Sequence, residues 1–240
     1  AQRNPVSVCF SPDERQLAVG TTDVHLIDIA SGQLLKTFEF ANRVVSVTFS
    51  PDGNQLAGAS DKGGVRLWEV ETTKLLQKWR IESGARCVCF SPDGQWVAAS
   101  GGGFPTPGIA KVFSAQTGKE VLDLQGHAAR VYGICFSASG DRIATASADQ
   151  SIRVWDAQTG QPTLGPLIGH HDFVNSVCFS PDGKRLVSGG WDRSLRIWDT
   201  QSGEEVLMLR GHKKRLNTVQ FSPDGRLLLS ASDSQHQHDD

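Results

Sequence analysis

The chain has 240 residues, of which 38% are apolar and 21% are charged, and its formal net charge is −2. This is enough for a sizeable core, and all-β chains of this length commonly form one domain. A balance near neutrality does not favour nucleic acid or an anionic membrane as the main partner, because both call for a clustered excess of lysine and arginine. No apolar run is long enough to span a bilayer, and no charged-then-apolar leader opens the sequence.

A short motif, Phe-Ser-Pro-Asp-Gly or a close variant, returns six times along the chain. Its phenylalanines are Phe10, Phe49, Phe90, Phe136, Phe179 and Phe221, so the period is 39 to 46 residues. Self-similarity at such a period indicates an array of one supersecondary unit that must stack on its neighbours to bury a core.

Each repeat is predicted to form four short strands. In the clearest copy, residues 174–179, 185–190, 195–199 and 205–212 are strand-like runs separated by turn sequences. In the Ser-Pro-Asp-Gly turns, proline sets its own backbone angle and glycine accepts the positive φ that reverses the chain. Short connections of this kind predict that the four strands form an antiparallel meander. The strands of each repeat are called a to d in chain order.

Gly-His and Trp-Asp pairs then carry a family resemblance. Gly-His stands at 126–127, 169–170 and 211–212, and Trp-Asp at 155–156 and 198–199. The chain resembles the WD-repeat β-propellers, whose blades are four-stranded antiparallel sheets. The resemblance is weaker in the first three repeats, where Ile27, Trp68 and Phe113 occupy the tryptophan position and the Gly-His pair is absent. It implies an all-β fold.

The repeats predict five complete blades and half of a sixth. The sixth has only strands a and b, at 216–221 and 227–232. We expect residues 1–232 to form a WD-repeat β-propeller within a larger array of about seven blades or more. Residues 233–240 are then a polar tail or the start of the next loop. A closed ring with fewer blades is the alternative.

Five cysteines lie on strand a of four repeats. Cys9, Cys89, Cys135 and Cys178 directly precede a repeat phenylalanine, and Cys87 lies two residues before Cys89. A small apolar side chain repeated at one packing position predicts buried, reduced thiols that face neighbours in their own blade. None has the spacing of a zinc site or a redox pair, which favours a reducing, cytoplasmic location.

Two further segments resemble chemical motifs only loosely. The run at 101–108, Gly-Gly-Gly-Phe-Pro-Thr-Pro-Gly, lacks the lysine of a phosphate-binding loop and is interpreted as an inserted surface loop carrying Phe104. His236 and His238 form a pair in a polar terminal run, which is more typical of a solvated tail than of a metal site. The sequence therefore predicts no metal and no cofactor.

The histidines are interpreted as structural. In the family that this chain resembles, a histidine, a hydroxyl residue, an aspartate and a tryptophan form a buried hydrogen-bonded chain in each blade. Carried over, these roles fall on His127, Thr145, Asp149 and Trp155 in the fourth blade and on His170, Ser188, Asp192 and Trp198 in the fifth. Ser, His and Asp also form hydrolase triads, but a nucleophile is needed once, whereas this set recurs with the repeat.

The remaining surface signal lies at one end of the blades. In a meander, the loop before strand a and the turn between strands b and c fall at the same end, here called the top. The residues predicted there for partner binding are Arg43, Arg86, Arg130, Tyr132, Phe173, Asn175, Trp191, Arg215 and Asn217. Aromatic and arginine side chains are enriched at protein interaction hot spots. The alternative is that the aromatic rings pack on their own blade and the arginines are solvated charges.

Three hypotheses for function follow. The first is a non-catalytic scaffold that presents its top face to a protein or peptide partner. The second is a sensor or regulatory domain whose effector, such as a nucleotide-dependent switch, a protease or a kinase, lies outside this chain. The third is an enzyme at the channel mouth, which the sequence does not favour because the arginines have no evident carboxylate or nucleophile beside them. Nucleic acid, membrane and small-molecule partners are not expected.

Overall fold

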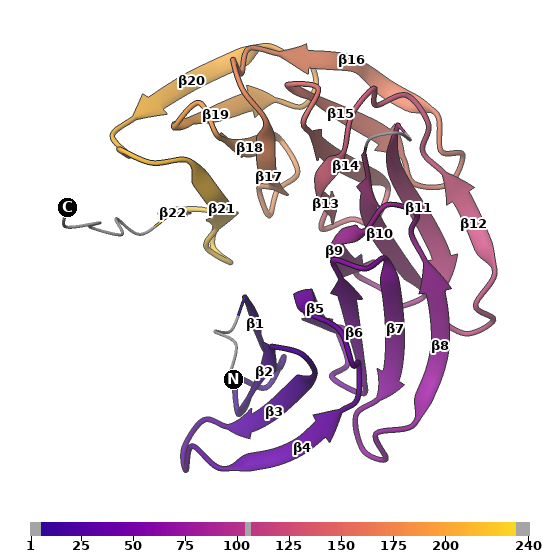
Figure 1. Ribbon diagram of the computed structural model, residues 1–240. Coiled ribbons are helices and arrows are strands. Elements are labelled where there is room, and N and C mark those ends of the chain that lie inside the picture. Colours follow the sequence, from indigo (N-terminus) through magenta and orange to yellow (C-terminus); the bar gives the residue numbers. More distant parts are fainter. Residues whose placement is uncertain (1–5, 104–106, 234–240) are drawn as a thin grey trace, which may run out of the picture. The chain divides into compact units, whose positions relative to one another are not determined.

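The computed structural model describes residues 6–103 and 107–233, and every regular element in these ranges is a β-strand. The chain divides into two compact units, Ala1–Val131 and Tyr132–Asp240. Each contains a succession of antiparallel sheets in which strand order follows chain order (Figure 1). The sheets are the blades that the repeat predicted.

The first unit holds three four-stranded sheets. Blade 1 comprises β1 (Ser7–Phe10), β2 (Gln16–Gly20), β3 (Val24–Asp28) and β4 (Leu34–Phe38). Blade 2 comprises β5 (Val44–Phe49), β6 (Gln55–Ser60), β7 (Gly64–Glu69) and β8 (Leu75–Arg80). Blade 3 comprises β9 (Ala85–Phe90), β10 (Trp96–Gly102), β11 (Gly108–Ser114) and β12 (Glu120–Asp123).

The second unit holds two four-stranded sheets and a two-stranded one. Blade 4 comprises β13 (Val131–Phe136), β14 (Arg142–Ser147), β15 (Ser151–Asp156) and β16 (Pro162–Ile168). Blade 5 comprises β17 (Val174–Phe179), β18 (Arg185–Gly190), β19 (Ser194–Asp199) and β20 (Glu205–Arg210). Blade 6 comprises β21 (Leu216–Phe221) and β22 (Leu228–Ser232). The predicted five and a half blades are confirmed.

The Ser-Pro-Asp-Gly turns form as the sequence predicts. In the turn after β17, Gly183 has φ 67° and its N–H donates to the carbonyl of Ser180 at 2.8 Å, while the Ser180 hydroxyl donates to Asp182 at 2.6 Å. In the first copy, where Glu14 replaces glycine, the residue still adopts φ 59°. The motif is therefore a turn-forming unit whose serine and aspartate satisfy each other.

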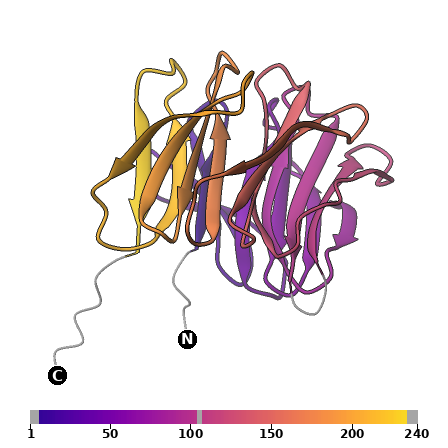
Figure 2. The same ribbon diagram turned by 90° about the horizontal axis from the view of Figure 1, so that it is seen from above.

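Neighbouring blades pack face to face through apolar residues. In the second unit, one cluster joins Ala146 and Val154 of blade 4 to Val177, Leu186 and Trp198 of blade 5. Figure 2 shows the strands of blades 5 and 6, coloured orange to yellow, and consecutive strands of each blade are antiparallel. This alternation places the loop before strand a and the b–c turn at the same end of a blade.

A serine on strand a also links neighbouring blades. Ser176 Oγ of blade 5 accepts a hydrogen bond from Val219 N–H of blade 6 at 3.1 Å, and Ser46 of blade 2 accepts one from Val88 N–H of blade 3 at 3.1 Å. The same serine position, three residues before each repeat phenylalanine, is filled by Ser7 in blade 1, which accepts from Val47 N–H at 3.1 Å. Backbone groups at the blade junction are thereby satisfied.

The cysteines correct one expectation. The described residues include all five, and no disulfide joins any of them. They are half-buried, and burial raises the pKa of the Cys9 and Cys178 thiols. Cys178 of blade 5, however, packs against a cluster that holds Leu216 and Val219 of blade 6 as well as Val187 and Leu195 of its own blade. The reason is the pleat, because adjacent strand residues point to opposite faces of the sheet.

The run at 101–108 is also corrected in part. Gly101 and Gly102 belong to β10 and Gly108 begins β11, so the surface insertion is shorter than predicted. Phe104 lies outside the described residues, as do His236 and His238.

Candidate interaction surface

The top end of each blade is held together by backbone hydrogen bonds between its two connections. In blade 5, Trp191 N–H of the b–c turn donates to Phe173 O of the loop before strand a at 2.8 Å. Blade 2 repeats this bond between Asp61 N–H and Arg43 O at 3.2 Å. The two connections therefore share one end, as the meander predicts, and their side chains are presented together.

Three aromatic side chains from blades 4 and 5 meet at the top of the second unit. Phe173 and Trp191 have ring centroids 4.8 Å apart, and Tyr132 lies 6.1 Å from Phe173 and 6.0 Å from Trp191. All three are half-buried. We call Tyr132, Phe173 and Trp191 the aromatic stack. Its rings support one another and still offer apolar area to a partner.

Arg215 of blade 6 extends the aromatic stack. Its guanidinium carbon lies 4.4 Å from the Trp191 ring centroid, and its Nε donates a hydrogen bond to the carboxylate of Asp233. The arginine side chain remains 50% exposed. A cation held over an indole face is a favourable cation–π arrangement. Arg215 is consequently fixed in direction while its charge stays accessible.

The two predicted asparagines serve as supports. Asn175 Nδ2 donates to the backbone carbonyl of Asn217 at 2.7 Å, and Asn217 Nδ2 donates to Asp233 Oδ1 at 2.5 Å. These bonds join the strand a residues of blades 5 and 6 to the carboxylate that holds Arg215. The predicted residues Tyr132, Phe173, Asn175, Trp191, Arg215 and Asn217 thus form one continuous set in the second unit.

The three predicted arginines of the first unit differ in their environments. Arg43 is exposed and lies 3.9 Å from Asp61. Arg130 directs its guanidinium at backbone, with Nε donating to Gly102 O at 2.5 Å and Nη2 to Ser83 O at 3.2 Å. Arg86 is half-buried. Arg130 is therefore engaged in holding loops of blade 3.

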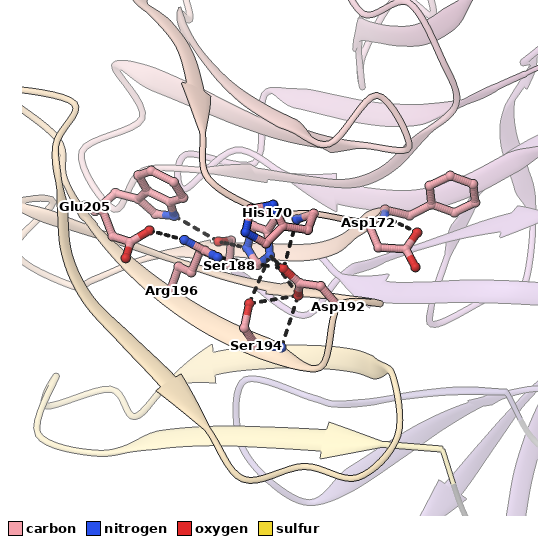
Figure 3. Close-up of polar contacts among 10 residues, drawn as sticks. His170, Asp172, Ser188, Asp192, Ser194, Arg196 and Glu205 are labelled. Carbon is pink, nitrogen blue, oxygen red and sulfur yellow. Dashed lines mark hydrogen bonds and ion pairs between the residues drawn. The ribbon is translucent and has the colours of Figure 1, made fainter.

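A Ser-His-Asp set, the other candidate site, lies inside blade 5 (Figure 3). His170 Nε2 is 2.8 Å from Ser188 Oγ, and His170 Nδ1 is 3.0 Å from Asp192 Oδ2. Trp198 Nε1 donates to the same Ser188 oxygen at 2.9 Å. An ionised carboxylate can only accept, so His170 Nδ1 carries a proton.

This set is enclosed by the blade. Ser188 and His170 have exposed fractions of 0% and 2%, and the indole N–H occupies one side of the serine oxygen. No substrate atom can reach that hydroxyl. Blade 4 repeats the inner bond, with Trp155 Nε1 donating to Thr145 Oγ1 at 2.9 Å, and Asp149 accepting from the Ser151 hydroxyl at 2.6 Å. The remaining predicted member, His127, is buried at 2% exposure. The geometry is that of a structural hydrogen-bonded chain.

Asp192 is the charged member of this chain. Burial alone would raise its pKa, but hydrogen bonds from His170, Ser194 and the His171 N–H, together with electrostatic attraction by His170, hold that pKa well below the ordinary aspartate value. The carboxylate is consequently ionised at neutral pH and orients the imidazole.

Sequence reasoning missed a buried ion pair beside this chain. Arg196 of β19 is 5% exposed, its Nη1 is paired with Glu205 of β20, and its Nη2 lies 4.0 Å from Asp192 (Figure 3). The signal was present in the repeat. A basic residue recurs two positions before the tryptophan position, as Arg66, Lys111, Arg153 and Arg196. A cation that faces the blade interior at each repeat needs a carboxylate or carbonyl there.

In blade 2 the polar chain is replaced by aromatic packing. Phe40 lies with its ring centroid 5.6 Å from that of Trp68, and a Cβ added at Gly58 would lie 3.2 Å from both side chains. Gly58 stands where blade 5 has Ser188. A ring therefore fills the space that histidine and hydroxyl occupy in the later blade, which explains why this repeat lacks Gly-His.

The part of the chain that the structure describes, residues 6–103 and 107–233, has neither a metal-binding cluster nor a membrane-spanning helix. Among those residues there is no group of three His, Cys, Asp or Glu side chains able to hold a metal ion. The same residues contain no helix long and apolar enough to cross a bilayer.

Comparison with known families agrees with the blade architecture. A sequence model described as "WD domain, G-beta repeat" matches residues 32–69, 74–104, 118–156, 161–199 and 203–236. The chain belongs to the WD-repeat family. The matched segments begin near the turn before strand d, so each spans parts of two blades.

Individual WD-repeat proteins resemble the chain at 27% to 30% identity over part of its length. The chain is 30% identical over 160 residues to Periodic tryptophan protein 2 of Arabidopsis thaliana, covering 65% of this chain and 18% of that protein. It is 27% identical over 166 residues to Eukaryotic translation initiation factor 3 subunit I of Aspergillus terreus, covering 62% and 48%. It is 27% identical over 169 residues to human WD repeat and HMG-box DNA-binding protein 1, covering 65% and 15%. The aligned part is therefore less than half the length of each of these relatives.

Proposed function

We propose that this WD-repeat chain is a non-catalytic interaction module that binds a protein or peptide segment at the top of blades 4 to 6. The observation that carries the proposal is the aromatic stack with Arg215 over Trp191. Large rings and a prefixed guanidinium bury much area on binding and lose few rotamers, which is the composition of an interaction hot spot.

The repeat itself supports a surface role over catalysis. The Ser-His-Asp arrangement around His170 has catalytic residue types, but it is buried and holds the blade together. One relative bears the name of a translation initiation factor subunit, and a subunit acts by contacting other proteins. The absence of any disulfide among the five cysteines is compatible with a reducing compartment, which we propose to be the cytoplasm.

A peptide library displayed on phage tests the proposal. The full 240-residue chain is immobilised, selected binders are recovered, and each is titrated against Trp191→Ala and Phe173→Ala. We expect each variant to weaken binding by about 1–3 kcal/mol. The matched control is Trp96→Ala, which removes another half-buried tryptophan from the end of blade 3 that carries its Ser-Pro-Asp-Gly turn.

The proposal fails if the selected binders keep their affinity for the two top-end variants or lose it equally with Trp96→Ala. Melting temperatures are measured on the same samples. The rings of the aromatic stack pack on one another, so Trp191→Ala is also expected to lower the melting temperature. The loss of affinity is therefore compared with that of a control variant whose melting temperature is equally low.

A regulatory role within a longer protein is the second candidate. It is favoured by the partial coverage of the relatives, of which the aligned part makes up 15% to 48%. In that case these blades belong to a larger array and transmit binding to an effector elsewhere. The regulatory role requires an effector domain encoded in the same reading frame as these residues. Sequencing the full reading frame therefore tests this second candidate.

A further inference from the structure

At the top of the second unit, the cationic side chains are more exposed to solvent than the anionic ones. The exposed charged side chains there are Arg193, Lys213, Lys214 and Arg215. The carboxylates at the same end, Asp149, Asp172, Asp192 and Asp233, are all half-buried. The formal charges of the four cations and the four carboxylates cancel. The cationic side chains, however, are exposed to solvent, whereas the carboxylates are partly buried in the loops. A partner that approaches this end meets a positive surface.

Each withdrawn carboxylate is already bound within the fold. Asp172 Oδ1 accepts from Phe173 N–H at 2.7 Å, Asp192 Oδ2 accepts from His171 N–H at 3.1 Å, and Asp233 Oδ1 accepts from Asn217 at 2.5 Å. These bonds hold the carboxylates in half-buried positions, so their negative charge lies farther from an approaching partner than the charge of the exposed cations. The positive character of this end is therefore a property of how the loops fold, which composition does not reveal.

Arg215 is the cation best placed to recognise an anion. It donates to Asp233 through Nε, and its two terminal nitrogens make no hydrogen bond to the described residues. The Trp191 face below and Asp233 beside it set the plane of the guanidinium. A planar fork with both outer nitrogens available suits a carboxylate, which it binds through two parallel hydrogen bonds.

We propose that the segment bound at this end is an acidic peptide, in which a carboxylate is taken by the outer nitrogens of Arg215 and an adjacent apolar side chain rests on the aromatic stack. Lys213 and Lys214, which precede Arg215 in the same loop, attract further carboxylates of the segment. The inference rests on the proposed function and adds the chemistry of the partner to it.

Other occupants fit this end less well. A basic segment would be repelled by the exposed cations, and the Trp191 face that would receive its charge is covered by Arg215. A nucleic acid strand would also meet positive charge, but its successive bases stack on aromatic rings spaced along a groove, whereas the three rings here form one half-buried cluster. These two occupants are outcomes of the test below.

The test is a titration of the full chain, by fluorescence anisotropy, with three labelled peptides of equal length and the same Leu-Phe centre. They carry flanking glutamates, flanking glutamines or flanking lysines, and a labelled oligothymidylate is the fourth probe. We expect the glutamate peptide to bind about ten-fold more tightly than the glutamine peptide and to weaken as salt is raised. The lysine peptide should bind least.

Arg215→Ala should lower the affinity for the glutamate peptide about ten-fold and leave that for the glutamine peptide nearly unchanged. Arg215→Lys should recover only part of the loss, because lysine keeps the charge and lacks the fork. The matched control is Arg226→Ala, which removes an exposed arginine of the same blade from the Ser-Pro-Asp-Gly turn and should change nothing.

The outcomes separate the two proposals. If all three peptides bind equally and all lose affinity with Trp191→Ala, the acidic-partner inference is overturned and the interaction surface stands. Tighter binding of oligothymidylate than of the glutamate peptide also overturns the inference. If no peptide binds, or if Trp191→Ala changes no affinity, both proposals fail.

Discussion

Two tryptophans of blade 5 show how position decides the role of a residue. Trp198 is 2% exposed and donates its indole N–H to Ser188, whereas Trp191 is half-buried on the surface with Phe173 and Arg215 around it. The first completes a hydrogen-bonded chain inside the sheet. The second supplies apolar area outside it.

Replacement of Trp198 by alanine should lower the free energy of unfolding by about 3–5 kcal/mol, because it removes a large buried ring and leaves Ser188 without its donor. Trp198→Phe keeps most of the ring and should cost less, about 1–3 kcal/mol. Urea denaturation of the two variants measures both values, with Trp191→Ala as the surface comparison. Equal stability of the wild type and Trp198→Ala would contradict the structural assignment of the His170 chain.

The glycines of two Gly-His pairs should respond differently to alanine. A Cβ at Gly169 would lie 2.9 Å from Arg196 Nη1 and from the Trp198 ring, whereas a Cβ at Gly211 meets no atom within 4 Å. Overpacking of this kind costs about 1–3 kcal/mol, so Gly169→Ala should melt lower and Gly211→Ala near the wild type. Identical melting temperatures for the two would show that the loop around Gly169 relaxes freely.

At the scale of one blade, the hydrogen-bonded chain makes stability depend on pH. The pKa of Asp192 is lower in the fold than in the unfolded chain, so its ionised form stabilises the fold above the ordinary aspartate pKa of about 3.9. That contribution is lost as the pH falls from there through the lowered value. The blade is thus held by a charge that acid removes.

Asp192→Asn should be less stable than the wild type by about 1–3 kcal/mol at neutral pH, because the amide cannot accept all the bonds that the carboxylate accepts. The difference should shrink as the pH falls below about 3.9, because the unfolded wild-type chain then takes up a proton that the folded carboxylate still excludes. Denaturation of both proteins across this range measures it. A difference that stays constant down to strongly acidic pH would contradict the role given to the charge.

At the scale of the whole molecule, blade 6 leaves a sheet edge and an apolar face open among the described residues. β22 pairs there only with β21, and Leu229 is 62% exposed. Leu209 of β20 is 45% exposed, while its counterparts in blades 1, 2 and 4, Phe38, Trp79 and Leu167, are buried. The next blade covers that position elsewhere: Trp79 of blade 2 stacks on Phe113 of blade 3.

We therefore expect the 240-residue chain to self-associate as its concentration rises, because open strand edges pair with other chains. A lysine on the edge, Leu229→Lys, should reduce this association, as should an added peptide with the sequence 194–210, which supplies two strands of the blade pattern. Leu227→Lys, outside the strand, is the control for solubility alone. Sedimentation velocity measures the species present, and a monomer at every concentration would contradict the expectation.

The sequence determined the blades of this protein. Each strand, each Ser-Pro-Asp-Gly turn and the chain around His170 and Trp198 depend on residues that are close in one repeat, and repetition marks them six times over. It also indicated which end of a blade holds Trp191 and Phe173, because a meander leaves no other arrangement for its loops.

Only the tertiary structure decided what those loop residues do. Tyr132, Trp191 and Arg215 come from three different blades, and the directions of their side chains depend on packing between blades that no single repeat contains. For the same reason Arg130, outwardly similar to Arg215, is engaged with the Gly102 carbonyl, and Asp233 holds Arg215 in place. Local hydrogen bonds can be read from spacing, whereas contacts between repeats are set by the shapes of loops that differ from one repeat to the next.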